Sequence, residues 1–243
     1  MEVWLEVAPS TNRGRVLERV SMVKEMVDAV FVPEAPLGYP RAHAIAVAHV
    51  VKEALGVRAF ASLRTLDVNT NALISLLGAS LVLGIDGVIV TRGDRPAFGS
   101  EVRDVGTEDA IRIARSDKRL RSLKLGVVVS LAKGYAKISE RLLGLDIDLA
   151  LISRLWRAEQ LDHEVFKEAR KKGVKLYPYI VVSSEEERER LFSMLQGHQR
   201  VFLEHEVPEF VKELEDLVDG IVITAPLNFR VAIKVLESVR KIL

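Results

Sequence analysis

The chain has 243 residues, of which 49% are hydrophobic and 28% are charged. Both fractions are ordinary for a globular protein, and this length suits one (β/α)8 barrel without a second domain. Lys and Arg number 35 while Asp and Glu number 34, so no net field draws the chain to nucleic acid or to an anionic membrane. We therefore expect a small-molecule partner, and neither nucleic acid nor a membrane.

The absence of cysteine excludes disulfides, thiolate nucleophiles and cysteine-ligated metal sites. Residues 1–7 lack the basic leader and the long apolar stretch of a signal peptide, which predicts a cytoplasmic location. The most hydrophobic window, residues 73–90, contains Asp86 and three glycines, which favours a buried helix and a buried strand over a membrane span. Asn and Gln total only seven, a composition typical of thermophiles.

Short runs rich in β-branched residues alternate with longer segments of helical period. The predicted strands are residues 3–7, 29–33, 57–63, 87–91, 125–130, 148–152, 175–181 and 220–224. Strict alternation favours a parallel sheet, and eight units favour closure into a (β/α)8 TIM barrel that occupies residues 1–243 as a single domain. The alternative is an open doubly wound sheet.

Several polar residues have the spacing of helix N-caps. Asp162 precedes a helix that ends at Gly173, Ser183 with Glu186 has capping-box spacing, and Asn228 precedes the last helix. The long connection 197–219 is expected to hold one short helix near residues 207–217. We see no linker, low-complexity stretch or strict internal repeat.

Glu6 is the first candidate for chemistry. It lies in the first predicted strand, where alternation of side chains points it into the barrel mouth. Apolar neighbours raise the pKa of a carboxyl group by desolvation, which suits a general acid near neutral pH. The alternative is a strand-end glutamate paired with an arginine.

A second candidate is the turn Thr91 to Asp94 after the fourth strand. Gly93 is free to adopt a turn conformation that brings the backbone close to a ligand, and Asp94 can then bind a cofactor or substrate ring. The alternative is an ordinary turn in which Asp94 accepts a local backbone hydrogen bond.

Basic residues follow several of the predicted strands. Arg64, Arg92, Lys133 and Arg154 together would make the mouth cationic and able to bind a phosphate or a glutamate tail. Asp67 follows Arg64, and a polar residue at or shortly after it is expected to cap the next helix. The alternative for each basic residue is a surface salt bridge. The five histidines show no metal-ligand spacing, and neither a P-loop nor a Gly-x-Gly-x-x-Gly motif is present, so no metal is expected.

The sequence resembles the methylenetetrahydrofolate reductases. Residues 5–9 resemble the opening strand of that family, and residues 67–96 resemble its third helix, fourth strand and Arg/Thr-Gly-Asp-x-Pro loop in order and spacing. The resemblance implies a TIM barrel that binds FAD and acts on a folate or a modified pterin in one-carbon metabolism. It implies that Glu6 donates a proton to the pterin, that Arg92, Gly93 and Asp94 contact the flavin, and that Asp94 also contacts the substrate.

Other family positions differ. Residues 62–64 replace a His-Leu-Thr segment, and the family's flavin-holding stretch after the fifth strand has no counterpart in residues 130–135. Ser153 and Arg154 replace a Thr-Gln pair. Arg64 and Arg154 would then supply substrate contacts that the family obtains elsewhere.

The first functional hypothesis is therefore a flavin-dependent reductase, an oxidoreductase acting on CH-NH donors, with a nicotinamide or a partner protein as electron donor. The second is a flavin-free pterin-binding or accessory subunit. The third is a barrel that binds an unrelated phosphorylated metabolite through Arg64, Arg92 and Arg154. A homo-oligomer is compatible with each.

Overall fold

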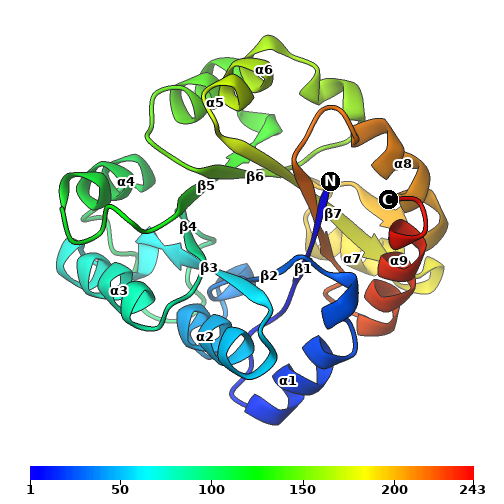
Figure 1. Ribbon diagram of the computed structural model, residues 1–243, viewed down its shortest axis with the longest axis horizontal. Coiled ribbons are helices and arrows are strands. Elements are labelled where there is room, and N and C mark those ends of the chain that lie inside the picture. Colours follow the sequence, from blue (N-terminus) through cyan, green and yellow to red (C-terminus); the bar gives the residue numbers. More distant parts are fainter.

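Parallel strands form the centre of the computed structural model, which describes residues 1–243, and helices surround them (Figure 1). The strands are β1 (Glu2–Glu6), β2 (Ala29–Val32), β3 (Arg58–Arg64), β4 (Gly87–Thr91), β5 (Leu125–Ser130), β6 (Leu149–Ser153), β7 (Lys175–Ser183), β8 (Val201–Leu203) and β9 (Gly220–Thr224). The strands pair in the order β6-β5-β4-β3-β2-β1-β9-β7, and the additional pairing of β6 with β7 closes the sheet on itself. The predicted TIM barrel is confirmed, and the open-sheet alternative is wrong.

The helices follow the strands in the predicted alternation. They are α1 (Arg13–Ser21), α2 (Ala44–Leu55), α3 (Thr70–Val82), α4 (Thr107–Ser116), α5 (Tyr135–Leu142), α6 (Glu164–Lys171), α7 (Arg188–Met194), α8 (Val207–Leu214) and α9 (Phe229–Arg240). Single 3-10 turns occupy Lys24–Met26, Pro36–Gly38, Thr65–Asp67, Leu131–Lys133, Ala158–Leu161, Glu185–Glu187 and Glu204–Glu206. None of the helices is long and apolar enough to cross a membrane.

Strand β8 is a feature that the sequence did not predict. Val181 of β7 pairs with Thr224 of β9 on one edge and with Val201 of β8 on the other. β6 pairs with the earlier part of β7, so β8 continues the edge of β7 beyond the point where β6 ends. In the chain, α7 and β8 come between β7 and α8. They form an insertion at the carboxyl end of the barrel, because β8 pairs with the last residues of β7.

The capping predictions had mixed outcomes. Asn228 caps α9, with its side chain accepting from the N–H of Arg230, and Asn69 caps α3 through the N–H of Ala72. The prediction for Asp162 is wrong by one position, because His163 is the N-cap of α6. The prediction for Ser183 is also wrong, because β7 extends through this residue and buries it.

The core divides into two main parts, as expected for a barrel covered by helices. A cluster of 61 buried residues fills the space between the strands and the helices. A second cluster fills the barrel interior, where the ring of Trp4 stacks between Phe60 and Tyr177 with centroid distances of 4.2 Å to each. The interior is therefore a packed core that separates the two ends of the barrel.

Four aspartates repeat one interaction at the amino end of the barrel. Each immediately precedes an alternate strand, and its carboxylate accepts a hydrogen bond from a backbone N–H at the start of the preceding strand in the barrel. The pairs are Asp28 with Val3, Asp86 with Ala59, Asp148 with Leu125, and Asp219 with Leu176, at 2.8 to 2.9 Å. Each aspartate N–H also donates to the carbonyl of the same partner residue. The strands are thus joined in four equivalent pairs.

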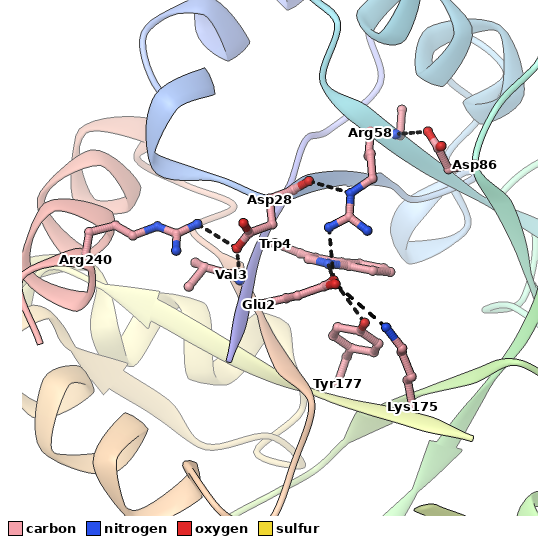
Figure 2. A network of polar contacts seen from close by, with 10 residues as sticks. Glu2, Val3, Trp4, Asp28, Arg58, Asp86, Lys175, Tyr177 and Arg240 are labelled. Atoms are coloured by element: carbon pink, nitrogen blue, oxygen red, sulfur yellow. Dashed lines mark hydrogen bonds and ion pairs between the residues drawn. The ribbon is translucent and has the colours of Figure 1, made fainter. Parts of the chain in front are cut away.

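Each of these aspartates also forms an ion pair with a cation. The cation comes from the helix that precedes the partner strand around the barrel, which for β1 is α9. The ion pairs are Arg240 with Asp28, Lys52 with Asp86, Arg115 with Asp148, and Arg170 with Asp219. Figure 2 shows the first of them, together with Glu2, which accepts hydrogen bonds from Trp4 and Tyr177 and pairs with Arg58. Burial by itself would raise the pKa of Asp28, but the Val3 N–H and Arg240 more than offset this and hold the pKa below its ordinary value. The sequence contains no strict internal repeat, yet this interaction recurs four times.

We expect Asp86→Ala to lower the free energy of unfolding by about 1–3 kcal/mol, because the N–H of buried Ala59 and the ammonium of Lys52 both lose their acceptor. Urea denaturation measures the change. Glu53→Ala is the control, since Glu53 is exposed and its pairing with His49 should contribute less than about 0.5 kcal/mol. Equal losses in the two variants would contradict a special role for the aspartate.

Candidate functional site at the carboxyl end of the barrel

The open end of the barrel interior is lined by polar side chains. Alternation along each strand and the pairing registers place Glu6, Ser62, Val128 and Tyr179, from β1, β3, β5 and β7, in one inward-facing layer. Thr91, Ser153 and Thr224 of β4, β6 and β9 follow in the next layer outward. These two layers lie directly beyond the aromatic interior and form the floor of the mouth.

Glu6 is the carboxylate of this floor. Its Oε1 accepts a hydrogen bond of 2.8 Å from the hydroxyl of Thr224, and no cation pairs with it. Burial raises the pKa of Glu6 to about 7, although the Thr224 hydroxyl lowers it in part. The structure thus places Glu6 in the mouth, as predicted, and the alternative of an arginine pair is wrong.

Tyr179 lies beside Glu6 and was not among the residues that the sequence predicted for the site. Its ring packs edge-on against Phe31 with a centroid distance of 6.1 Å. Burial and the nearby charge of Glu6 raise the pKa of Tyr179 well above its ordinary value, so its hydroxyl keeps its proton. Strict alternation along β7, counted from Lys175, is the sequence signal that could have placed this residue in the mouth.

Arg64 is buried beneath the loops that follow β2 and β4. Its side chain is 2% exposed, and its guanidinium donates to the carbonyls of Ala35 and Asp94 and pairs with Asp67, with 2.9 Å between Nε and Oδ2. The donors of Arg64 therefore hold protein groups, and this arrangement favours a structural role. A substrate contact by Arg64 stays a prediction.

The turn at Gly93 is shaped by Arg64. Gly93 has a φ of +83°, and a Cβ added there would collide with the Arg64 side chain. The carboxylate of Asp94 accepts from the N–H of Leu37, so this turn joins the loops after β2 and β4. Local packing thus accounts for both residues, while their predicted contacts with a cofactor stay untested.

Arg92, Lys133 and Arg154 remain as cations around the mouth, each in or beside a loop that follows a strand. None of the three makes an ion pair, so the surface salt-bridge alternative is wrong for them. Arg154 has a φ of +62°, a strained value for a residue with a side chain, and its N–H donates to the buried side chain of Gln199. The charge of Arg92, after Arg103, still helps to lower the pKa of Glu101, so Arg92 has an acidic neighbour although it forms no ion pair.

A shallow cavity of about 330 Å³ adjoins the mouth between the loops after β2 and β4. Glu34, Asp67 and Phe98 are among its lining residues. Burial raises the pKa of Glu34, while the N–H of Ala44 and the neighbouring His43 offset part of this effect. Because the Glu34 carboxylate accepts a hydrogen bond from the N–H of Ala44 at the start of α2, helix capping accounts for the position of Glu34. No group of three or more His, Asp or Glu side chains is arranged to hold a metal ion.

Comparison with known proteins locates the chain by its fold. No protein-family model and no curated protein matches the sequence. Among solved structures, orotidine 5'-phosphate decarboxylase from Pyrococcus horikoshii is 14% identical and superposes with a TM-score of 0.57 over 98% of this chain and 99% of that chain. 3-Hexulose-6-phosphate synthase is 15% identical and superposes with a TM-score of 0.57 over 98% of this chain and 100% of that chain. The tryptophan synthase alpha-subunit from Pyrococcus furiosus is 12% identical and superposes with a TM-score of 0.58 over 99% of this chain and 97% of that chain. The similar structures are TIM-barrel enzymes.

The comparisons overturn the family resemblance. Orotidine 5'-phosphate decarboxylase, 3-hexulose-6-phosphate synthase, the tryptophan synthase alpha-subunit and oxaloacetate acetylhydrolase are not methylenetetrahydrofolate reductases, so the suspected family and the flavin-dependent reduction derived from it are not supported. The accessory-subunit alternative gains no support either. The packing of Arg64 against Gly93 and Asp94 gives a physical reason for the Gly-Asp part of the similar segment, because this turn needs glycine without any shared ligand.

The raised pKa of Glu6 predicts a pH-dependent stability. An unfolded glutamate ionises near its ordinary value of 4.5, whereas folded Glu6 ionises near 7. The contribution of neutral Glu6 to the free energy of unfolding is therefore complete below pH 4.5. The free energy of unfolding then falls by about 3 kcal/mol as the pH rises through 7. Glu6→Gln cannot ionise, so its stability relative to the parent protein should increase between pH 5 and pH 8. Denaturant titrations at both pH values measure this, and Glu53→Gln should keep the parental pH dependence.

Gly93→Ala should destabilise the protein by about 2–4 kcal/mol, because it adds a steric collision with immobilised Arg64 to the cost of a positive φ. Gly99→Ala is the matched control, since Gly99 has a φ of +79° but open space around its Cβ position, and it should lose only about 1 kcal/mol. Thermal unfolding distinguishes the two losses. Similar values would show that Arg64 is free to move.

Proposed function

We propose that this protein is an enzyme that transfers a proton to or from a small anionic substrate bound in the mouth of the barrel, with Glu6 carrying the proton. The observation behind the proposal is the carboxyl of Glu6, which lies at a strand end without a cationic partner and has a pKa of about 7. Both protonation states are populated near neutral pH, so the same group can act as a general acid or a general base. Catalytic groups of TIM barrels occupy this end of the strands.

The anionic character of the substrate is supported by the free cations at the rim. Arg92, Lys133 and Arg154 form no ion pair within the protein, whereas Arg115 and Arg240 at the opposite end each pair with an aspartate. Two of the similar structures are named for phosphate-bearing molecules, orotidine 5'-phosphate and 3-hexulose-6-phosphate. A phosphate or carboxylate group held by the rim would position the rest of the substrate over Glu6.

Other predictions about this protein do not enter the proposal. Binding of FAD, an electron-donor protein, self-association and a cytoplasmic location stay predictions from the sequence. FAD binding no longer has the family resemblance on which it was based. The proposed proton transfer by Glu6 depends on none of them.

Turnover of small phosphorylated and carboxylated metabolites, followed by NMR after selection of binders by thermal shift, tests the proposal. Glu6→Gln should reduce kcat at least about 100-fold for any compound that the parent protein converts, because proton transfer contributes that much or more. The kcat/KM profile of the parent should inflect near pH 7. Glu53→Gln, which alters an exposed carboxylate on α2, should leave kcat unchanged. A Glu6→Gln variant with the parental rate would refute the role of Glu6.

A further inference from the structure

Tyr179 faces the barrel interior and has a hydroxyl without a partner inside the protein, a combination that the other tyrosines lack. The Tyr177 hydroxyl donates to Glu2 at 3.0 Å, the Tyr135 hydroxyl donates to the carbonyl of Gln160 at 3.1 Å, and Tyr39 is 55% exposed. Tyr179 is half-buried, and its hydroxyl is not among the enclosed polar atoms that lack a partner, so it is open to the mouth. The hydroxyl of Tyr179 is therefore left available to a molecule in the mouth.

The position of Tyr179 beside Glu6 is well defined. Both residues belong to the inward-facing layer at the floor of the mouth, and the charge of Glu6 acts on the Tyr179 hydroxyl. The ring is held by its edge-on contact with Phe31. The hydroxyl of Tyr179 on β7 and the carboxyl of Glu6 on β1 thus face the same part of the mouth.

A second unpartnered hydroxyl lies on the same side of the mouth. Ser130 Oγ is buried and makes no hydrogen bond, and Ser130 pairs in register with Ser153 at the end of β6. β6 pairs with β7 as far as Ile152 and Pro178, and Ser153 and Tyr179 are the residues that follow directly on the two strands. Two free hydroxyl donors, those of Ser130 and Tyr179, therefore lie on adjoining parts of the wall formed by β5, β6 and β7.

A carboxylate base and neutral hydroxyl donors suit one type of proton transfer. When a base removes a proton from the carbon next to a carbonyl, the C–H bond breaks and its electron pair forms a C=C bond. The carbonyl π electrons move onto oxygen, and the enolate oxygen becomes negative. Fixed hydrogen-bond donors aimed at that oxygen stabilise the transition state. Return of the proton from the carboxyl to carbon restores the carbonyl, so no oxidant or reductant is needed.

We propose that Tyr179 is a second catalytic residue, which donates a hydrogen bond to the carbonyl oxygen of the substrate while Glu6 removes the proton from the adjacent carbon, with Ser130 as an additional donor. The substrate class is then an anionic carbonyl compound with a hydrogen on the carbon next to the carbonyl. This inference rests on the proposed proton transfer by Glu6.

Binding of oxalate, a planar anion that resembles an enolate, tests the donors without knowledge of the substrate. Isothermal titration at pH 6, where Glu6 is largely protonated, should give a dissociation constant in the micromolar to low millimolar range for the parent protein. Tyr179→Phe should weaken binding about tenfold or more, because a hydrogen bond to an anion is lost while the ring still packs against Phe31. Ser130→Ala should weaken binding by a smaller factor.

Tyr177→Phe is the matched control. It removes a hydroxyl from the same face of β7, but that hydroxyl is bonded to Glu2 at the other end of the barrel, so oxalate binding should change less than twofold. Glu6→Gln should retain oxalate binding, because Gln is a neutral isostere of the protonated carboxyl. Absence of oxalate binding to the parent, or equal affinities of the parent and Tyr179→Phe, would overturn the role of Tyr179. Either result would leave the Glu6 proposal standing, which only the turnover of Glu6→Gln can refute.

Discussion

The four aspartate carboxylates at the amino end of the barrel are the interaction on which the rest of the structure depends. A backbone N–H at the start of a strand needs an acceptor, and Asp28, Asp86, Asp148 and Asp219 each supply one to the preceding strand in the barrel. Each pair of strands is thereby held in one register. A slip of one residue would turn every inward side chain outward, so these bonds also determine which side chains reach the mouth.

The interior transmits this register from the structural end of the barrel to the mouth. At the amino end, Glu2 accepts hydrogen bonds from Trp4 and Tyr177. The ring of Trp4 in turn stacks on Phe60 and Tyr177. This aromatic layer excludes water beneath Glu6, and the resulting desolvation is the larger influence on the pKa of that residue. The four aspartates and Glu2 at the amino end are paired with cations, while the carboxyl end retains an unpaired acid and unpaired cations. Stability and chemistry are therefore placed at opposite ends of one core.

Much of the fold could be predicted from the sequence, because continuous apolar strands alternate with amphipathic helices and this pattern is local. The position of Glu6 followed from alternation along a short strand. The three-residue strand β8 is too short to give a pattern, and the bonds of Arg64 to Ala35 and Asp94 join segments far apart in the sequence. Tyr179 was missed because its importance depends on a neighbour on another strand. The Arg-Gly-Asp turn within the segment that resembles a reductase misled for a related reason, since a turn packed around Arg64 needs glycine whatever ligand the protein binds.

The energetic cost of Glu6 is itself an argument for its function. Glu2, Asp28 and Glu206 are also partly buried, but hydrogen bonds and arginines lower the pKa of each, so their charges are compensated. Glu34 has a raised pKa and caps α2 through Ala44, which gives it a structural reason to be there. Glu6 has only the hydroxyl of Thr224, a bond that no helix or strand requires, and its ionisation lowers stability at neutral pH. A neutral residue would fill this position at lower cost, so retention of a carboxyl group in the mouth is best explained by chemistry performed there.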